Sequence, residues 1–279
     1  NKYLDMMSAY SAVSHGHAHP ELVKVFRDQS ETLSLTSRAF YTNTLGPYLE
    51  TITKMTGFEM ALPMNSGAEA VETAIKSARR WAYRSKKIEP NKAEIIVAEG
   101  NFHGRTTTII SFSSESNSKD DFGPHTPGFI SVEFGSTKAV EDAITDNTAA
   151  VLFEPVQGEG GIIEPPQNWL SDVRNICDKN NVLMILDEVQ SGLGRTGKLF
   201  AFEHANIRPD GLILGKALGG GFMPVSVFLS SKDVLQWMNP GSHGSTFGGN
   251  PLGSAIAKRS LELLYEEGLI ENSRIMGEY

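Results

Sequence analysis

Short apolar runs that alternate with helix-like segments constrain the fold of this 279-residue chain more than any other feature. Runs of this length are too short for helices and are typical of strands buried on both faces of a sheet. The alternation predicts an α/β fold with a mainly parallel sheet flanked by helices in three layers. The predicted strands are Ile95–Ala98, Thr108–Phe112, Ala150–Phe153, Val182–Leu186 and Leu212–Leu214, and the predicted helices are Ser66–Arg84, Lys138–Ile144, Trp169–Lys179 and Ser254–Glu267.

Polar residues follow three of the predicted strands at the points where those strands end. Glu154, Asp187 and Lys216 occupy these positions. Because ligands of parallel sheets bind beyond the carboxyl ends of the strands, we expect the three side chains to converge on one edge. Burial would lower the pKa of Lys216 and make its amine a nucleophile. The alternative is a lysine that reaches solvent and an aspartate that only stabilises a turn.

The segment Asn65-Ser-Gly-Ala-Glu-Ala70 carries the signals of a helix start. Ser66 and Glu69 have the spacing of a capping box. Free N–H groups at such a start bind anions, and Gly67 allows a phosphate to approach the backbone closely. The segment predicts either a phosphate site or an ordinary capped helix.

Two glycine-rich segments admit other interpretations. Gly192–Gly197 matches the dinucleotide pattern G-x-G-x-x-G, which would suit a nicotinamide dehydrogenase. The match is weak because the segment does not directly follow a strand and no long helix comes after it. The hydroxyl and N–H groups of Gly241–Pro251 suit either a phosphate-binding loop or a plain loop.

Composition excludes several classes of function. A formal net charge of −8 argues against nucleic-acid binding, and no apolar run approaches the roughly 20 residues that cross a membrane. The single cysteine, Cys177, excludes an internal disulfide and suits a reducing compartment, the cytoplasm or the mitochondrial matrix. His15, His17 and His19 lack a nearby cysteine or carboxylate, so we expect no metal site.

Six motifs in order resemble the class III, fold type I family of pyridoxal-phosphate-dependent aminotransferases. Three further segments resemble the ornithine-specific members more than the acetylornithine or 4-aminobutyrate members: Ser8–Val13, Leu35–Tyr41 and Phe122–Phe129. The six motifs are Asn65-Ser-Gly-Ala-Glu-Ala70, Asn101-Phe-His-Gly-Arg105, Glu154-Pro-Val-Gln-Gly-Glu-Gly160, Asp187-Glu-Val-Gln190, Gly215-Lys-Ala-Leu-Gly-Gly220 and His243-Gly-Ser-Thr-Phe-Gly-Gly-Asn-Pro251.

The resemblance implies roles around the pyridoxal phosphate ring. Lys216 is expected to hold the cofactor covalently and to carry the proton of the reaction, and Asp187 to pair with the ring nitrogen. Gln190 would contact the phenolic oxygen, while Phe102 and Val189 would pack on opposite faces of the ring.

Phosphate and substrate contacts are implied in the same way. Ser66, Gly67 and Ala68 would bind the phosphate together with Ser245 and Thr246 of a neighbouring subunit, which implies a homodimer with shared active sites. On the substrate side, the expected residues are Tyr10 for ornithine, Arg105 for a carboxylate of 2-oxoglutarate, and Glu154 and Glu159; His103 stands beside the cofactor where ornithine-specific members commonly have an aromatic residue such as tryptophan.

The resemblance also implies a division of the chain and an activity. Residues 1–252 would form the cofactor-binding large domain with an N-terminal lead-in, and residues 253–279 a helix leading towards a C-terminal small domain that is largely missing. The expected reaction moves the δ-amino group of L-ornithine to 2-oxoglutarate. The alternatives are another class III aminotransferase or a cofactor-binding but inactive module.

Overall fold

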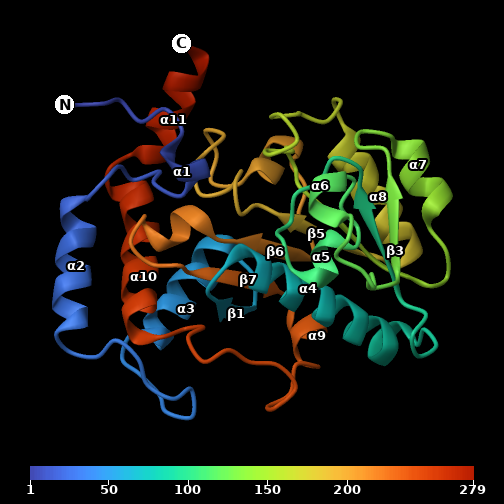
Figure 1. Cartoon of the computed structure of the whole chain (residues 1–279), viewed down its shortest axis with the longest axis horizontal. Helices are drawn as coiled ribbons and strands as arrows, with labels where there is room; N and C mark the ends of the chain where they lie inside the picture. The colour runs from blue at the N-terminus through green and yellow to red at the C-terminus, as the bar shows by residue number, and fades with distance from the viewer.

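One seven-stranded sheet forms the centre of the computed structural model, which describes residues 1–279 (Figure 1). The strands lie in the order β1-β7-β6-β5-β4-β2-β3. The pairings of β7 with β1 and β6 are antiparallel and all the others are parallel, which confirms the predicted mainly parallel sheet. The strands are β1 (Met60–Met64), β2 (Glu94–Ala98), β3 (Phe129–Val132), β4 (Thr148–Phe153), β5 (Leu183–Asp187), β6 (Gly211–Leu214) and β7 (Ser226–Ser230).

The four predicted helices all form, with boundaries within a few residues of those expected. The helix predicted to end at Arg84 finishes with a π-helical turn over Ala82–Lys86. The α-helices are α1 (Ser8–Ser11), α2 (Pro20–Ser30), α3 (Leu45–Thr56), α4 (Gly67–Trp81), α5 (Thr107–Ile110), α6 (Ser116–Lys119), α7 (Thr137–Ala143), α8 (Trp169–Asn180), α9 (Lys232–Leu235), α10 (Pro251–Glu266) and α11 (Leu269–Glu278), and two short 3₁₀ helices cover Ala201–Ala205 and Lys216–Gly219.

The prediction of a strand at Thr108–Phe112 is wrong, because this segment forms α5. The hydroxyl of Thr106 accepts the N–H of Ile109 at 3.2 Å and so caps a helical turn. Ile109 and Ile110 are buried, as a strand would also have required. A short apolar run looks the same in both structures, and only the upstream cap decided between them.

Alternation along the strands divides the core between the two faces of the sheet. In β4, Val151 and Phe153 belong to a cluster of 31 buried residues that includes α3, α8 and α10. Ala150 and Leu152 belong to a second cluster of 22 residues, which includes α4. Figure 1 shows helices on both sides of the sheet. Because successive strand residues point to opposite faces, this gives the predicted three-layer α/β fold.

Helix α4 carries the predicted capping box and a buried small-residue face. Ser66 Oγ accepts the N–H of Glu69 at 3.2 Å, and Glu69 Oε2 accepts the N–H of Ser66 at 2.7 Å. Ala70, Ala74 and Ala78 are fully buried. Their small side chains bring the α4 backbone close to the sheet, so the start of the helix is placed firmly at the sheet edge.

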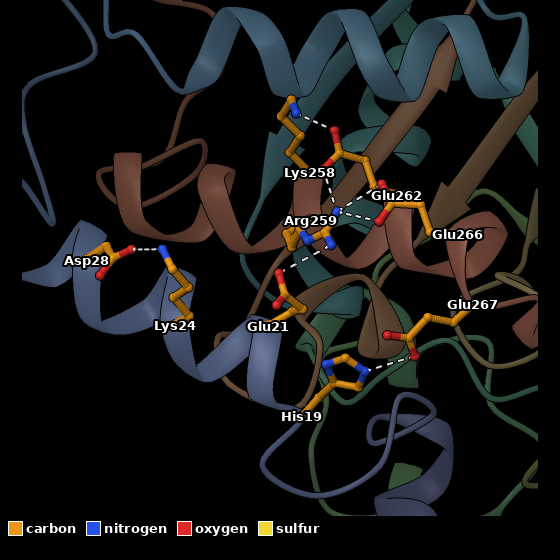
Figure 2. Close-up of polar contacts among 9 residues, drawn as sticks. All are labelled: His19, Glu21, Lys24, Asp28, Lys258, Arg259, Glu262, Glu266 and Glu267. Carbon is orange, nitrogen blue, oxygen red and sulfur yellow. Dashed lines mark hydrogen bonds and ion pairs between the residues drawn. The ribbon is translucent and has the colours of Figure 1, made fainter.

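Helices α2 and α10 are joined by an apolar contact with ion pairs around it (Figure 2). Leu22 of α2 is fully buried in a small cluster with Leu252, Ile256 and Leu263. Around this contact, Arg259 pairs with three carboxylates, those of Glu21, Glu262 and Glu266. Figure 2 also shows Lys258 bonded to Glu262 and Lys24 bonded to Asp28. Exposed pairs of this kind contribute little, so burial of Leu22 supplies most of the attachment.

The three histidines near the N-terminus each bind a different partner. His15 Nε2 lies 2.9 Å from the carbonyl of Ser260. His17 Nε2 lies 2.7 Å from Asp5 Oδ2, and His19 Nε2 lies 3.1 Å from Glu267 Oε2. Two of the three contacts therefore attach the N-terminal segment to α10 and the turn that follows it.

Both chain ends lie on the side of the molecule that carries α1 and α11 (Figure 1). Arg195 joins the N-terminal segment to α11, because its side chain donates to Ser14 Oγ at 2.7 Å and its carbonyl accepts from Ser273 Oγ at 3.0 Å. The division at residue 252 stays a prediction; α10 starts at Pro251 and packs into the same core as α3. None of the helices combines the length and apolar character that a membrane crossing requires.

Candidate active site

A cavity of about 170 Å³ lies at the carboxyl ends of the parallel strands. Glu154 follows β4, Asp187 ends β5 and Lys216 follows β6. All three line this cavity, which confirms the predicted convergence. Parallel strands bring their carboxyl ends to one edge, and the sequence places a polar residue at each of these ends.

Asp187 forms a buried pair with His103. Asp187 Oδ2 accepts from His103 Nδ1 at 2.7 Å, and the two side chains are 4% and 0% exposed. The other carboxylate oxygen accepts the N–H of Val189 at 3.0 Å. Burial lowers the pKa of His103, but the hydrogen bond and charge of Asp187 outweigh it, so the net pKa is raised. The two contacts therefore hold the Asp187 carboxyl group in one orientation.

Glu154 is a second buried carboxyl group at the cavity. It accepts the N–H of Phe102 at 3.0 Å and that of Gly158 at 3.4 Å. Burial, assisted by the charge of Asp187, raises the pKa of Glu154 to about 7, although His103 opposes this shift. The cavity thus holds two carboxyl groups in different environments, one paired with a histidine and one with a pKa of about 7.

Lys216 sits directly after β6 in an unusual backbone conformation. Its φ of +45° lies in the left-handed region, which non-glycine residues rarely occupy. Strained conformations of this kind are concentrated at functional sites. Burial lowers the pKa of Lys216, while Glu159, Asp187 and Glu154 raise it, and the net shift is downward. The amine is therefore more readily deprotonated than an ordinary lysine.

The start of α4 presents two free N–H groups to the cavity. The N–H of Glu69 is capped by Ser66 Oγ, and the N–H of Ala70 reaches the carbonyl of Ser66. The unused donors of the first turn are those of Gly67 and Ala68, and both residues line the cavity. The Ser66 side chain is instead bonded within the capping box, and Ser66 does not line the cavity. The helix start can therefore bind an anion through Gly67 and Ala68.

Phe102, Val189 and Gln190, the residues expected to contact the cofactor, also line the cavity. The side-chain amide of Gln190, however, donates to Glu159 Oε1 at 3.1 Å and to the carbonyl of Tyr10 at 3.3 Å. Gln190 thus connects the cavity to Glu159 and to the N-terminal segment. Its predicted contact with a cofactor oxygen stays a prediction.

The predicted substrate residues other than Glu154 lie outside the cavity lining. Tyr10 is 57% exposed and approaches through its backbone carbonyl. Arg105 is exposed, with its guanidinium 5.8 Å from the centre of the Phe102 ring. Glu159 is exposed and is bonded by Gln190. Their substrate contacts stay predictions.

Ser245 and Thr246 also lie outside the cavity lining. Ser245 Oγ accepts from Asn65 Nδ2 at 2.9 Å and from the N–H of Gly248 at 3.0 Å, all within one chain. Thr246 is exposed. Ser245 therefore lies beside the residue that precedes the α4 cap, and the contribution of both hydroxyls to a neighbouring subunit stays a prediction.

Three lining residues were not predicted from the sequence, Gly104, Val156 and Ser191. Gly104 has a φ of +127°, and a Cβ there would lie 2.8 Å from the Cβ of Ala68. Only glycine fits between the two segments. Its position inside the Asn101–Arg105 motif was the available signal, whereas an apolar residue such as Val156 carries no comparable signal.

Comparisons with known proteins agree with this geometry. A family model described as aminotransferase class-III matches residues 1–279. The chain is 54% identical to an ornithine aminotransferase of Brevibacillus brevis, over all of this chain and 70% of that protein. It also resembles a crystal structure of the ornithine aminotransferase from Toxoplasma gondii, with a TM-score of 0.99 and 42% identity, over 100% of this chain and 66% of that one. An acetylornithine aminotransferase structure from Elizabethkingia anophelis gives a TM-score of 0.89 and 45% identity, over 100% and 67%. The chain thus spans about two thirds of the length of these relatives.

Proposed function

Because the chain belongs to the class III aminotransferases, we propose that it transfers the δ-amino group of L-ornithine to 2-oxoglutarate. The products are glutamate 5-semialdehyde and glutamate. The observation that carries the proposal is the meeting of Lys216, Asp187 and the start of α4 at one cavity. The 54% identity to an ornithine aminotransferase supports the choice of substrate.

Class III aminotransferases depend on pyridoxal phosphate, which when bound supplies an electron sink for the substrate. The residues at the cavity fit this group. Gly67 and Ala68 offer the free N–H groups that a phosphate requires. Asp187 offers a buried carboxylate, which suits a protonated ring nitrogen. Phe102 and Val189 offer apolar surface for the ring.

Lys216 and Asp187 then have separate tasks. The lowered pKa of Lys216 leaves its Nζ able to take a proton from the substrate carbon and return it. Asp187 is kept in place by His103 and by the N–H of Val189. An adjacent carboxylate raises the pKa of a cation by roughly 1–3 units, which corresponds to about 10- to 1000-fold in rate if the proton-transfer step is limiting.

We assign substrate selection to residues that line the cavity or contact its lining. Tyr10 recognises ornithine, and Arg105 binds a carboxylate of 2-oxoglutarate by bidentate pairing. Glu154 and Glu159 complete the substrate side, and Glu159 already accepts a hydrogen bond from Gln190, a residue that lines the cavity.

A homodimer completes the cofactor site. Ser245 and Thr246 of one subunit bind the cofactor phosphate held by the other subunit. Within one subunit Ser245 lies beside Asn65, just before α4, so this arrangement requires the α4 starts of the two subunits to lie close together in the dimer.

A panel of amine donors tests the activity. We expect the chain loaded with pyridoxal phosphate to convert ornithine to glutamate 5-semialdehyde faster than it uses acetylornithine or 4-aminobutyrate. Preference for acetylornithine would assign the protein to that branch, consistent with the 45% identity noted above. Cofactor binding without turnover of any donor would identify an inactive module.

A second experiment tests the assignment of the lysine. Borohydride reduction of the loaded protein, followed by peptide mass spectrometry, is expected to place the cofactor on Lys216. The variant Lys216→Met should remove the label. Lys179→Met, which changes an exposed lysine of α8, is the matched control and should keep it. A label on any other residue contradicts the assignment.

A further inference from the structure

The loop Gly241–Pro251 is attached to α4 through His243. His243 Nε2 lies 2.8 Å from Thr73 Oγ1, and His243 Nδ1 lies 2.8 Å from Lys76 Nζ. Thr73 is fully buried, whereas Lys76 is exposed. The imidazole therefore extends from the surface to a buried hydroxyl in the second turn of α4.

The donors and acceptors of this contact fix the state of the ring. The ammonium of Lys76 can only donate, so His243 Nδ1 must accept. A ring with an accepting Nδ1 is neutral and carries its proton on Nε2, which donates to Thr73 Oγ1. The hydroxyl of Thr73 in turn donates to the carbonyl of Glu69 at 2.7 Å. Lys76, His243, Thr73 and the carbonyl of Glu69 thus form one chain of hydrogen bonds, which we call the relay, in which each group donates to the next.

The surrounding charges favour the same state. Lys76 of α4 and Arg38 of the N-terminal segment face His243, and Glu69 opposes them from α4. Burial, together with these two cations, lowers the pKa of His243. Protonation would turn Nδ1 into a donor directed at a second donor. The relay is therefore intact at neutral pH and breaks in acid.

A second attachment lies two residues further along the loop. Ser245 Oγ accepts from Asn65 Nδ2, and the same amide nitrogen donates to Glu69 Oε1 at 3.2 Å. Ser245 thus contacts the residue just before the α4 cap, and His243 contacts the second and third turns of the helix. Between them the two contacts hold Ser245 against α4 of its own chain.

We propose that His243 is a positioning residue: its Lys76–His243–Thr73 relay holds the loop that offers Ser245 and Thr246 to the cofactor phosphate. The part of the inference that concerns phosphate rests on the proposed function. The relay itself depends only on contacts within this chain.

The tautomer of His243 is the first test. With ¹⁵N-labelled histidine, and the signal assigned through His243→Gln, long-range ¹H–¹⁵N spectra at pH 7 should show a neutral ring protonated at Nε2. Lys76→Met should raise the pKa of His243, because it removes a facing cation. A ring protonated at Nδ1, a cationic ring at pH 7, or no response to Lys76→Met overturns the relay whatever the protein binds.

Attachment of the loop is the second test, and it also needs no cofactor. In His243→Ala we expect the amide of Gly248, which Ser245 Oγ accepts at 3.0 Å, to exchange with solvent at least tenfold faster. His243→Gln presents an amide oxygen to Lys76 and an amide N–H to Thr73, so it should restore much of the protection. Unchanged exchange in His243→Ala overturns the positioning role.

Cofactor affinity is the third test. The loss of two hydrogen bonds is expected to weaken binding of pyridoxal phosphate about tenfold in His243→Ala, and His243→Gln should recover most of it. His125→Ala, which changes a histidine in a different loop, is the matched control. Equal affinity of His243→Ala and wild type contradicts the link to the phosphate. Wild-type protein that binds no cofactor contradicts the proposed function, while the first two tests still decide on the relay.

Discussion

Replacing His103 by phenylalanine should destabilise the chain far more than a surface substitution, because it leaves a carboxylate buried without its partner. The pair with Asp187 spans 2.7 Å, and both side chains are almost completely buried. After the change, Asp187 keeps only the N–H of Val189. Removal of one partner from a buried ion pair costs about 3–5 kcal/mol. We expect a loss in the free energy of unfolding within this range.

A double-mutant cycle separates the interaction energy of the His103–Asp187 pair from the effect of packing the new phenylalanine ring. Asp187→Asn alone should cost about 1–3 kcal/mol. In His103→Phe/Asp187→Asn neither charge of the pair remains, so the double variant should be more stable than the two single losses predict, with a coupling of about 1–3 kcal/mol. Urea unfolding without added cofactor gives the four free energies. The pair His17–Asp5, also 2.7 Å long but exposed, is the matched control and should show no measurable coupling.

The pH dependence of this coupling gives a sharper check. The pKa of His103 is raised in the folded chain, so its protonated form contributes stability below the ordinary value of 6.5. That contribution is lost as the pH rises through the raised pKa. The coupling should therefore be larger at pH 6 than at pH 9. Additive single effects, or a coupling that grows towards pH 9, would refute a charged pair.

Three further substitutions test the core and the cavity. Phe153→Ala, which removes a fully buried ring 5.2 Å from Trp169, should lower the free energy of unfolding by about 3–5 kcal/mol in urea titrations; a loss below about 1 kcal/mol would contradict the packing. Burial raises the pKa of Glu154 to about 7. The protonated side chain therefore contributes stability below the ordinary pKa of a glutamate, and this contribution is lost as the pH rises through 7. In urea titrations, the free energy of unfolding of Glu154→Gln should therefore exceed that of wild type at pH 8 by up to roughly 3 kcal/mol. At pH 4 the two values should differ little, and a larger gain at pH 4 than at pH 8 would disprove this burial effect. Gly158→Ala would place a methyl group 1.5 Å from Gln190 Oε1. We therefore expect the Gln190 side chain to move away from Glu159 with little change in thermal stability. A crystal structure of the variant with Gln190 unmoved would exclude the clash.

Much of the candidate site followed from local signals in the sequence. A run such as Leu212–Leu214 must be buried, and the polar residue after it must lie at the sheet edge. The same logic placed Asp187 and Glu154. The capping box at Ser66 was predicted because it depends only on residues four or fewer apart along the chain. These features are determined by short-range geometry, so no knowledge of the fold was required.

Other features depended on contacts between distant segments. The antiparallel direction of β7 is a property of the whole sheet. The pairing of His103 with Asp187 joins residues 84 positions apart. The sequence by itself determined which residues are polar at strand ends and helix starts; the tertiary structure decided which of them face one another, because hydrogen bonds, burial and pKa shifts depend on distances that only the folded chain defines.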